Sequence, residues 1–243
     1  MVINYIINSQ TGLRRESNED YANVFRLSNN LLAVVCDGLG GNQAGNIASK
    51  LAVDSIYSYF SQMNDEDDLS KVNSAILQAN ENIIIASQEK PSFNGMATTA
   101  EVLYISGSRA FWGHVGDSRI YYTTGNRLIQ LTKDHSVVQR LVDSGYITEK
   151  EAETHPHRNI IMRALGDKSS IIVDFDFLYL DETQPWKFLI CSDGVSGVLS
   201  KEEIEEYLNI DDLKKMSLVL SEKIDERGAP DNYTYIIISN KVK

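Results

Sequence analysis

Short apolar runs bounded by turn residues open the chain. They are rich in Val, Ile, Leu, Tyr and Phe, a composition typical of β-strands. Three such runs occupy residues 2–8, 21–27 and 31–37. Two longer segments follow, at 43–61 and 69–87, in which apolar residues recur every three or four positions. This spacing predicts two amphipathic helices after the first strands.

The rest of the chain returns to strand-like patterns and then ends with helices and a last strand. A capping box, Thr148 and Glu151, lies inside an irregular insertion at 133–165, and a second, Ser200 and Glu203, predicts the start of a helix. The acidic run 65–68 predicts a solvated loop that caps the second early helix. The expected strands are 97–106, 109–116, 119–124, 127–131, 170–180, 186–192 and 232–239, and the last helix is 211–226.

Strands grouped together and helices grouped in pairs predict an α+β fold. We expect two packed antiparallel sheets flanked by helix pairs, which is a four-layer αββα sandwich. No Pro-, Gly- or Ser-rich linker divides the 243 residues, so residues 1–243 are interpreted as a single domain. The insertion 133–165 interrupts this domain.

The composition of the chain mainly excludes classes of binding partner. The net charge of −11 and the pI near 4.8 argue against nucleic acid or an anionic membrane as the main partner. The N-terminal residues lack a basic leader and an apolar core, and no run of about 18 apolar residues occurs. The sequence therefore predicts a cytoplasmic chain, and nothing in it indicates more than a monomer.

Several apolar runs end on an aspartate beside glycine, as in VVCDG, HVGDS and LICSDG. An unpaired carboxylate at the buried end of a strand is costly unless its pKa shifts, its charge is paired or a cation binds. Mg²⁺ and Mn²⁺ prefer oxygen ligands, and Gly38 would also let a main-chain carbonyl approach an ion. The candidate metal ligands are Glu19, Asp20, Asp37, Gly38, Asp117, Asp193 and Asp231.

Each of these residues also has a simpler interpretation. Asp-Gly and Asp-Asn most often mark turns, and Asp117 could be a turn aspartate held by Arg119. Thr98 and Thr99 are interpreted as strand formers rather than nucleophiles. The GLGG loop resembles a nucleotide-binding loop, but Gln43 stands where its last glycine would be.

Two further kinds of site are disfavoured. The histidines His135, His155 and His157 lack the Cys or third clustered His that a zinc site would need. No EF-hand loop pattern supports a Ca²⁺-binding protein.

Seven short motifs then occur in an ordered set along nearly the whole chain. With these the sequence resembles the metal-dependent protein phosphatases, the type 2C serine/threonine phosphatases, in their short bacterial cytosolic form. The motifs are R15-x-x-NED, VVCDGLGG, GMATTA at 95–100, GHVGDSR, LTKDHS at 131–136, CSDG and PDN at 230–232.

The resemblance implies a binuclear Mn²⁺ or Mg²⁺ centre at one end of the sandwich. Asp37 would bridge two ions with the Gly38 carbonyl nearby, and Asp193 and Asp231 would complete the shell of one ion. A hydroxide between the ions would attack phosphorus, and Arg15 would bind the phosphate. The other expected roles are Glu19 on the second ion, Asp20 holding its waters, and Asp117 with Asp193 on a third, looser ion.

The implied activity is hydrolysis of phosphoserine and phosphothreonine esters on proteins, opposing a serine/threonine kinase. The insertion 133–165 matches the flap of the family. Leu39 stands where many eukaryotic members have a histidine thought to protonate the leaving group. The alternative is a phosphatase-like scaffold with little turnover. A missing acid would indicate that alternative, and all the matched acids are present.

Overall fold

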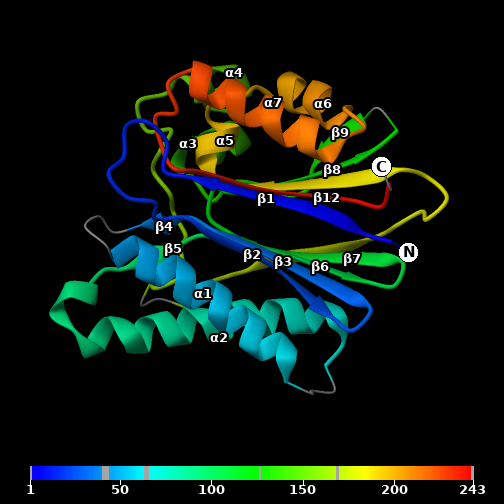
Figure 1. Cartoon of the computed structure of the whole chain (residues 1–243). Coiled ribbons are helices and arrows are strands. Elements are labelled where there is room, and N and C mark those ends of the chain that lie inside the picture. The colour runs from blue at the N-terminus through cyan, green and yellow to red at the C-terminus, as the bar shows by residue number, and fades with distance from the viewer. Residues whose placement is uncertain (1, 40–43, 63–65, 126, 168–169, 242–243) are drawn as a thin grey trace.

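Two five-stranded antiparallel sheets pack face to face at the centre of the protein (Figure 1). The computed structural model describes residues 2–39, 44–62, 66–125, 127–167 and 170–241. In spatial order, one sheet contains β1 (Asn4–Gln10), β12 (Tyr233–Ser239), β11 (Trp186–Cys191), β8 (Arg119–Thr124) and β9 (Arg127–Gln130). The other contains β10 (Asp174–Tyr179), β7 (Arg109–Val115), β6 (Ala100–Ser106), β3 (Asn30–Cys36) and β2 (Tyr21–Leu27).

Helix pairs cover the outer faces of both sheets, as Figure 1 shows. The pair α1 (Ala44–Ser61) and α2 (Asp68–Glu89) packs on the sheet that contains β3, β6 and β7. The pair α6 (Lys201–Leu208) and α7 (Leu213–Glu226) packs on the sheet that contains β11 and β12. The predicted αββα sandwich is confirmed.

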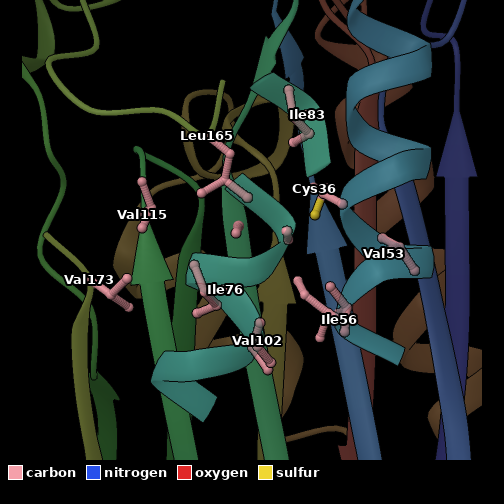
Figure 2. Close-up of a cluster of buried hydrophobic side chains, with 14 of the residues drawn as sticks. Cys36, Val53, Ile56, Ile76, Ile83, Val102, Val115, Leu165 and Val173 are labelled. Carbon is pink, nitrogen blue, oxygen red and sulfur yellow. The ribbon is translucent and has the colours of Figure 1, made fainter. Parts of the chain in front are cut away.

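Three apolar clusters fill the spaces between the four layers. One of them, drawn in Figure 2, includes Cys36 of β3, Val53 of α1, Ile76 of α2 and Val102 of β6, all of them fully buried. A second lies between the sheets and includes Trp186 and Phe188, and the third lies under α6 and α7. Cys36 and Cys191 are free and buried.

Most predicted elements are found within a few residues of their expected bounds. The capping boxes Thr148/Glu151 and Ser200/Glu203 are both formed, and Asp67 caps α2 through the backbone N–H groups of Leu69 and Ser70. Residue 43 of the first predicted helix and Asp65 lie outside the described residues, as does the end of the GLGG loop. No helix in the described ranges is long and apolar enough to cross a bilayer.

Two strand predictions are wrong in detail. The segment 97–106 is broken at Thr99 into β5 (Ala97–Thr98), which pairs with β4 (Gly38–Leu39), and β6, which pairs with β3 and β7. The break occurs because the chain changes partner beside Asp37. The strand expected at 170–180 is reduced to β10, because only Asp174–Tyr179 pairs with β7.

The segment 133–165 crosses from the first sheet to β10 with little regular structure. It contains α3 (Val137–Asp143) and α4 (Glu149–Glu153). The short η1 (Pro91–Phe93) follows α2, and α5 (Asp193–Ser196) follows β11. In Figure 1, the ends of β3 and β11 and the start of β12 lie on the same side of the sandwich as β4 and β5.

Candidate active site

The aspartate that ends β3 is fixed by two threonines of the broken strand. The backbone N–H of Asp37 donates to Thr99 Oγ1 at 2.9 Å, and its carbonyl accepts from Thr98 Oγ1 at 2.8 Å and from the Thr99 N–H at 2.9 Å. Both threonines are completely buried. Thr99 Oγ1 also lies 2.9 Å from Ser118 Oγ, next to Asp117. Thr98 and Thr99 therefore set the position of the Asp37 backbone, and Ser118 in turn contacts Thr99.

Asp37 meets other acids at this end of the sandwich. Burial, followed by the charges of Asp20, Asp193 and Asp117, raises the pKa of Asp37 well above its usual range. Burial and then the charge of Asp231 raise the pKa of Asp193. The structure thus brings together acids from five separate segments of the chain.

Asp20 and Asp117 are the most deeply buried of these acids, each only 6% exposed. Burial raises the pKa of Asp20 to about 7 and that of Asp117 to about 8, and the negative charges of neighbouring carboxylates add to the effect of burial. One oxygen of each carboxyl, Oδ1, has no hydrogen-bond partner. Ser192 Oγ donates to the other oxygen of Asp20 at 2.8 Å. Buried carboxyls with unpartnered oxygens are the donor set that a divalent cation would stabilise.

Arg119 does not hold Asp117 in the way the turn interpretation expected. Its guanidinium makes a two-point contact with Asp134, at 2.9 and 2.7 Å, and donates to Tyr121 Oη at 3.1 Å. Its charge lowers the pKa of Asp117, but burial and the acids outweigh it. The side chain of Asp117 is therefore available to another ligand.

Glu19 and the Gly38 carbonyl face a shared space. A Cβ built on Gly45 of α1 would come within 2.7 Å of Glu19 Oε2 and 2.9 Å of the Gly38 oxygen. A Cβ on Gly38 would lie 2.3 Å from the Gly45 oxygen and 2.4 Å from the Glu19 oxygen. Both positions need glycine because no side chain fits between these backbones.

Arg15 lies at the rim of the acid cluster. Its Nη2 contacts Asp231 Oδ2 at 2.7 Å, and 55% of its side chain is exposed. The hydrogen bond with Asp231 raises the pKa of Arg15, and the charges of Asp193 and Glu19 add to this. The guanidinium is thus held next to the acids with free donors facing solvent.

Asn232 joins the Arg15 loop to the end of the second sheet. Its amide donates to the carbonyls of Thr11 and Ser17 at 2.8 Å each, and its Oδ1 accepts from the Glu19 N–H at 2.9 Å. These three bonds fix the loop that carries Arg15 and Glu19 against Asp231.

The structure therefore places all seven predicted metal ligands and Arg15 at one end of the sandwich. Within the described part of the chain, no three His, Cys, Asp or Glu side chains are arranged so that they could hold one metal ion. Some candidate ligands also contact other protein groups: Asp231 contacts Arg15, and Asp20 accepts from Ser192. Metal ligation by these residues stays a prediction.

Sequence reasoning missed four supporting residues. Thr99 was interpreted only as a strand former, and Ser192, Asn232 and Gly45 were given no role at the site. Thr99, Ser192 and Asn232 lie within the recognised motifs GMATTA, CSDG and PDN, whereas Gly45 lies four residues after VVCDGLGG. For Ser192 and Asn232, which stand next to Asp193 and Asp231, adjacency to a candidate ligand was the available signal.

Two packed antiparallel sheets with a cluster of acids and an arginine at one end define the structural class of this protein. The sequence matches the family "Protein phosphatase 2C" over residues 13–226. The chain belongs to this family.

Individual relatives agree with this assignment. Serine/threonine protein phosphatase PstP of Mycobacterium tuberculosis is 36% identical over 239 residues, which are 98% of this chain and 45% of that protein. This chain thus spans less than half the length of PstP. Protein phosphatase PhpP of Streptococcus pneumoniae is 32% identical over 95% of each chain. The crystal structure of the PstP catalytic domain with two manganese ions has a TM-score of 0.85, with 32% identity and 97% coverage of both chains.

Proposed function

We propose that this protein is a metal-dependent phosphatase that hydrolyses phosphoserine and phosphothreonine monoesters on proteins. The observation that carries the proposal is the cluster of carboxyls with raised pKa values, the buried Asp20 and Asp117 and the half-buried Asp37 and Asp193. Carboxyls this close together repel one another when ionised, so the cluster favours a bound divalent ion. Family membership, and the names of PstP and PhpP, support this substrate class.

The proposed ligands divide between two ions, with Asp37 shared. Asp193 and Asp231 would serve one ion, and Glu19 and the Gly38 carbonyl the other, while Asp20 would orient its waters. Asp117 with Asp193 would take a third, looser ion. Mn²⁺ or Mg²⁺ bound there would supply Lewis-acid activation of water and of the phosphate ester. The two manganese ions in the PstP structure support the first two of these ions.

Arg15 provides a positive charge that can bind phosphate, which the acids cannot do. Its planar guanidinium matches phosphate oxygens, and Asp231 holds one edge of it while the rest of the side chain faces solvent. A phosphate bound there would offset the positive charge and be oriented toward the acid cluster. We assign Arg15 to phosphate binding and to stabilising charge that develops on the phosphoryl group.

The leaving group must obtain its proton from elsewhere than residue 39. Leu39 has no proton to donate, although it lies next to Gly38 at the edge of the site. Water or another acid must therefore protonate the leaving oxygen. Residues 133–165 act as the flap of the single domain 1–243. A cytoplasmic serine/threonine kinase would supply the phosphorylated substrates.

Phosphate release from a phosphothreonine peptide tests the proposal. We expect release with Mn²⁺ or Mg²⁺ and none after the metal is removed with a chelator. Asp37→Asn should lower kcat by at least about a hundredfold, because charge stabilisation by a bound ion is worth several kcal/mol. The matched control is Asp54→Asn on the exposed side of α1, which should retain activity. Folded protein that releases no phosphate with any metal would favour the scaffold alternative.

A further inference from the structure

A buried acid and a buried histidine lie between the two sheets, close behind the candidate active site. Glu101 of β6 and His114 of β7 are direct register partners, with 0% and 1% of their surface exposed. They share the strand face of Leu103 and Trp112, which pack in the core between the sheets. Neither residue belongs to the proposed catalytic machinery.

The protonation of this pair follows from its burial. Burial raises the pKa of Glu101 well above its usual range and lowers the pKa of His114, which favours the neutral form of each group. The Glu101 carboxyl then donates its proton in the hydrogen bond to His114 Nδ1. This leaves a proton on His114 Nε2, which donates to the Lys133 carbonyl at 2.9 Å. The first residue of the flap is thereby anchored to the core.

His135, which belongs to the flap, packs against His114. Its ring lies 4.4 Å from that of His114, centroid to centroid, and its backbone N–H donates to the Gly116 carbonyl at 2.6 Å. In return, the Gly116 N–H donates to His135 Nδ1 at 3.1 Å. His135 thus satisfies both backbone groups of the residue before Asp117.

The second ring nitrogen of His135 faces the end of the flap. Burial and then the neighbouring His114 lower the pKa of His135 to about 4, so its ring is neutral. Because Nδ1 accepts a bond, Nε2 carries the proton; it lies 3.2 Å from Asp174 Oδ2 and 3.0 Å from Arg163 Nη1. Arg163 contacts the same aspartate at 3.1 Å, and the Met162 N–H donates to the His135 carbonyl at 2.7 Å.

Asp117 depends on its backbone for its position, since Oδ1 of its buried carboxyl has no partner. Gly116 has a φ of +124°, and a Cβ there would lie 2.5 Å from the Thr99 side chain. The turn is therefore confined on one side by Thr99 and on the other by His135.

We infer that Glu101, His114 and His135 are positioning residues that hold the base of the flap, residues 133–136 and 161–163, against Gly116 and so fix the carboxylate of Asp117. The effect on catalysis rests on the proposed phosphatase function. The contact between the flap and Gly116 is independent of that function.

Two substitutions of His135 separate the two ring nitrogens. In His135→Asn, the Oδ1 atom of the new side chain would occupy the place of Nδ1 and still accept from Gly116, but the side chain is too short to reach Asp174. His135→Gln places its amide near the position of Nε2, where it can donate to Asp174 but leaves the Gly116 N–H unpaired. The two variants remove similar amounts of buried ring, which makes each the control for the other.

Amide hydrogen exchange in the metal-free protein is the direct readout. We expect exchange at Gly116 to rise about tenfold in His135→Gln, the effect of losing one hydrogen bond, and to stay within about twofold of wild type in His135→Asn. With metal and a phosphothreonine peptide, kcat should fall about tenfold in the Gln variant only, with KM unchanged. Equal Gly116 exchange and equal kcat in the two variants would overturn the inference.

Asp174→Ala provides a second test of the inference in case both His135 variants fail to fold. Asp174 is 52% exposed, so its loss should be tolerated, and exchange at the His135 amide should rise severalfold. Unchanged exchange there would also overturn the inference. If wild-type protein releases no phosphate, the proposed function fails, while the exchange comparison still decides the positioning role.

Discussion

Arg15 Nη2 lies 2.7 Å from Asp231 Oδ2, so the expected phosphate-binding arginine contacts an expected metal ligand. The pair joins a loop near the N-terminus to the residues before the last strand. It is half exposed, and such surface pairs contribute little to stability. Its importance therefore lies in orienting the guanidinium at the acid cluster.

The first prediction separates binding from stability at this arginine. Arg15→Ala should lower kcat/KM by about 10²–10³-fold, the usual effect of removing one group that stabilises transition-state charge. The unfolding temperature should change by only a few degrees, because the Arg15–Asp231 pair is exposed. Steady-state kinetics and thermal unfolding measure the two effects. Arg14→Ala, at the exposed neighbouring arginine, is the control and should leave both unchanged.

The second prediction concerns pH in the metal-free protein. Burial raises the pKa of Asp20 to about 7 and that of Asp117 to about 8, against about 4 in an unfolded chain. At pH values between the unfolded-state pKa and the folded-state pKa, the folded state binds more protons than the unfolded state. The free energy of unfolding therefore falls as pH rises through this range. Unfolding by urea in chelator should therefore show lower stability at pH 8.5 than at pH 5.5.

Metal should reverse this loss. Mn²⁺ that binds the folded state alone stabilises it by mass action, and it competes with protons for the same oxygens. Adding Mn²⁺ at pH 8.5 should raise the unfolding midpoint, and Asp20→Asn should reduce the pH dependence. A stability that increases steadily from pH 5.5 to 8.5 in chelator would contradict the buried acid cluster.

The third prediction addresses the support of Asp37. Thr99→Val keeps the shape of the side chain but leaves the Asp37 N–H without its acceptor. An unpaired buried donor costs about 1–3 kcal/mol, so the free energy of unfolding should fall by that amount and kcat should fall with it. Thr99→Ser keeps the hydroxyl and should retain most activity. Equal kcat in the Val and Ser variants would show that this hydrogen bond is dispensable.

The fourth prediction concerns the three hydrogen bonds that Asn232 makes with the Arg15 loop. Asn232→Ala removes three hydrogen bonds to the loop that carries Arg15 and Glu19. We expect faster proteolysis of residues 11–19 and a rise in KM for the phosphopeptide, because Arg15 loses its fixed position. Limited proteolysis and kinetics test this. Asn240→Ala, at an amide that bonds the Gln184 carbonyl far along the chain, is the matched control.

The sequence by itself determined the local elements and the chemistry of the site. Apolar runs and helical spacing predicted most strands and helices within a few residues, since these patterns depend on near neighbours. The capping pairs Thr148/Glu151 and Ser200/Glu203 are equally local and were predicted from residue identity. Asp37 was recognisable because a carboxylate at the end of a buried strand needs compensation wherever the rest of the chain lies.

Only the tertiary structure decided which groups support those acids. Thr98 and Thr99 fit a continuous strand by composition, but the chain changes partner between β5 and β6 and turns their hydroxyls toward Asp37. Ser192 reaches Asp20 across 172 positions in the sequence, and His135 reaches Gly116 only because the flap folds back on β7. Such contacts depend on how the sheets pair and pack over long sequence separations, which no local pattern of residues encodes.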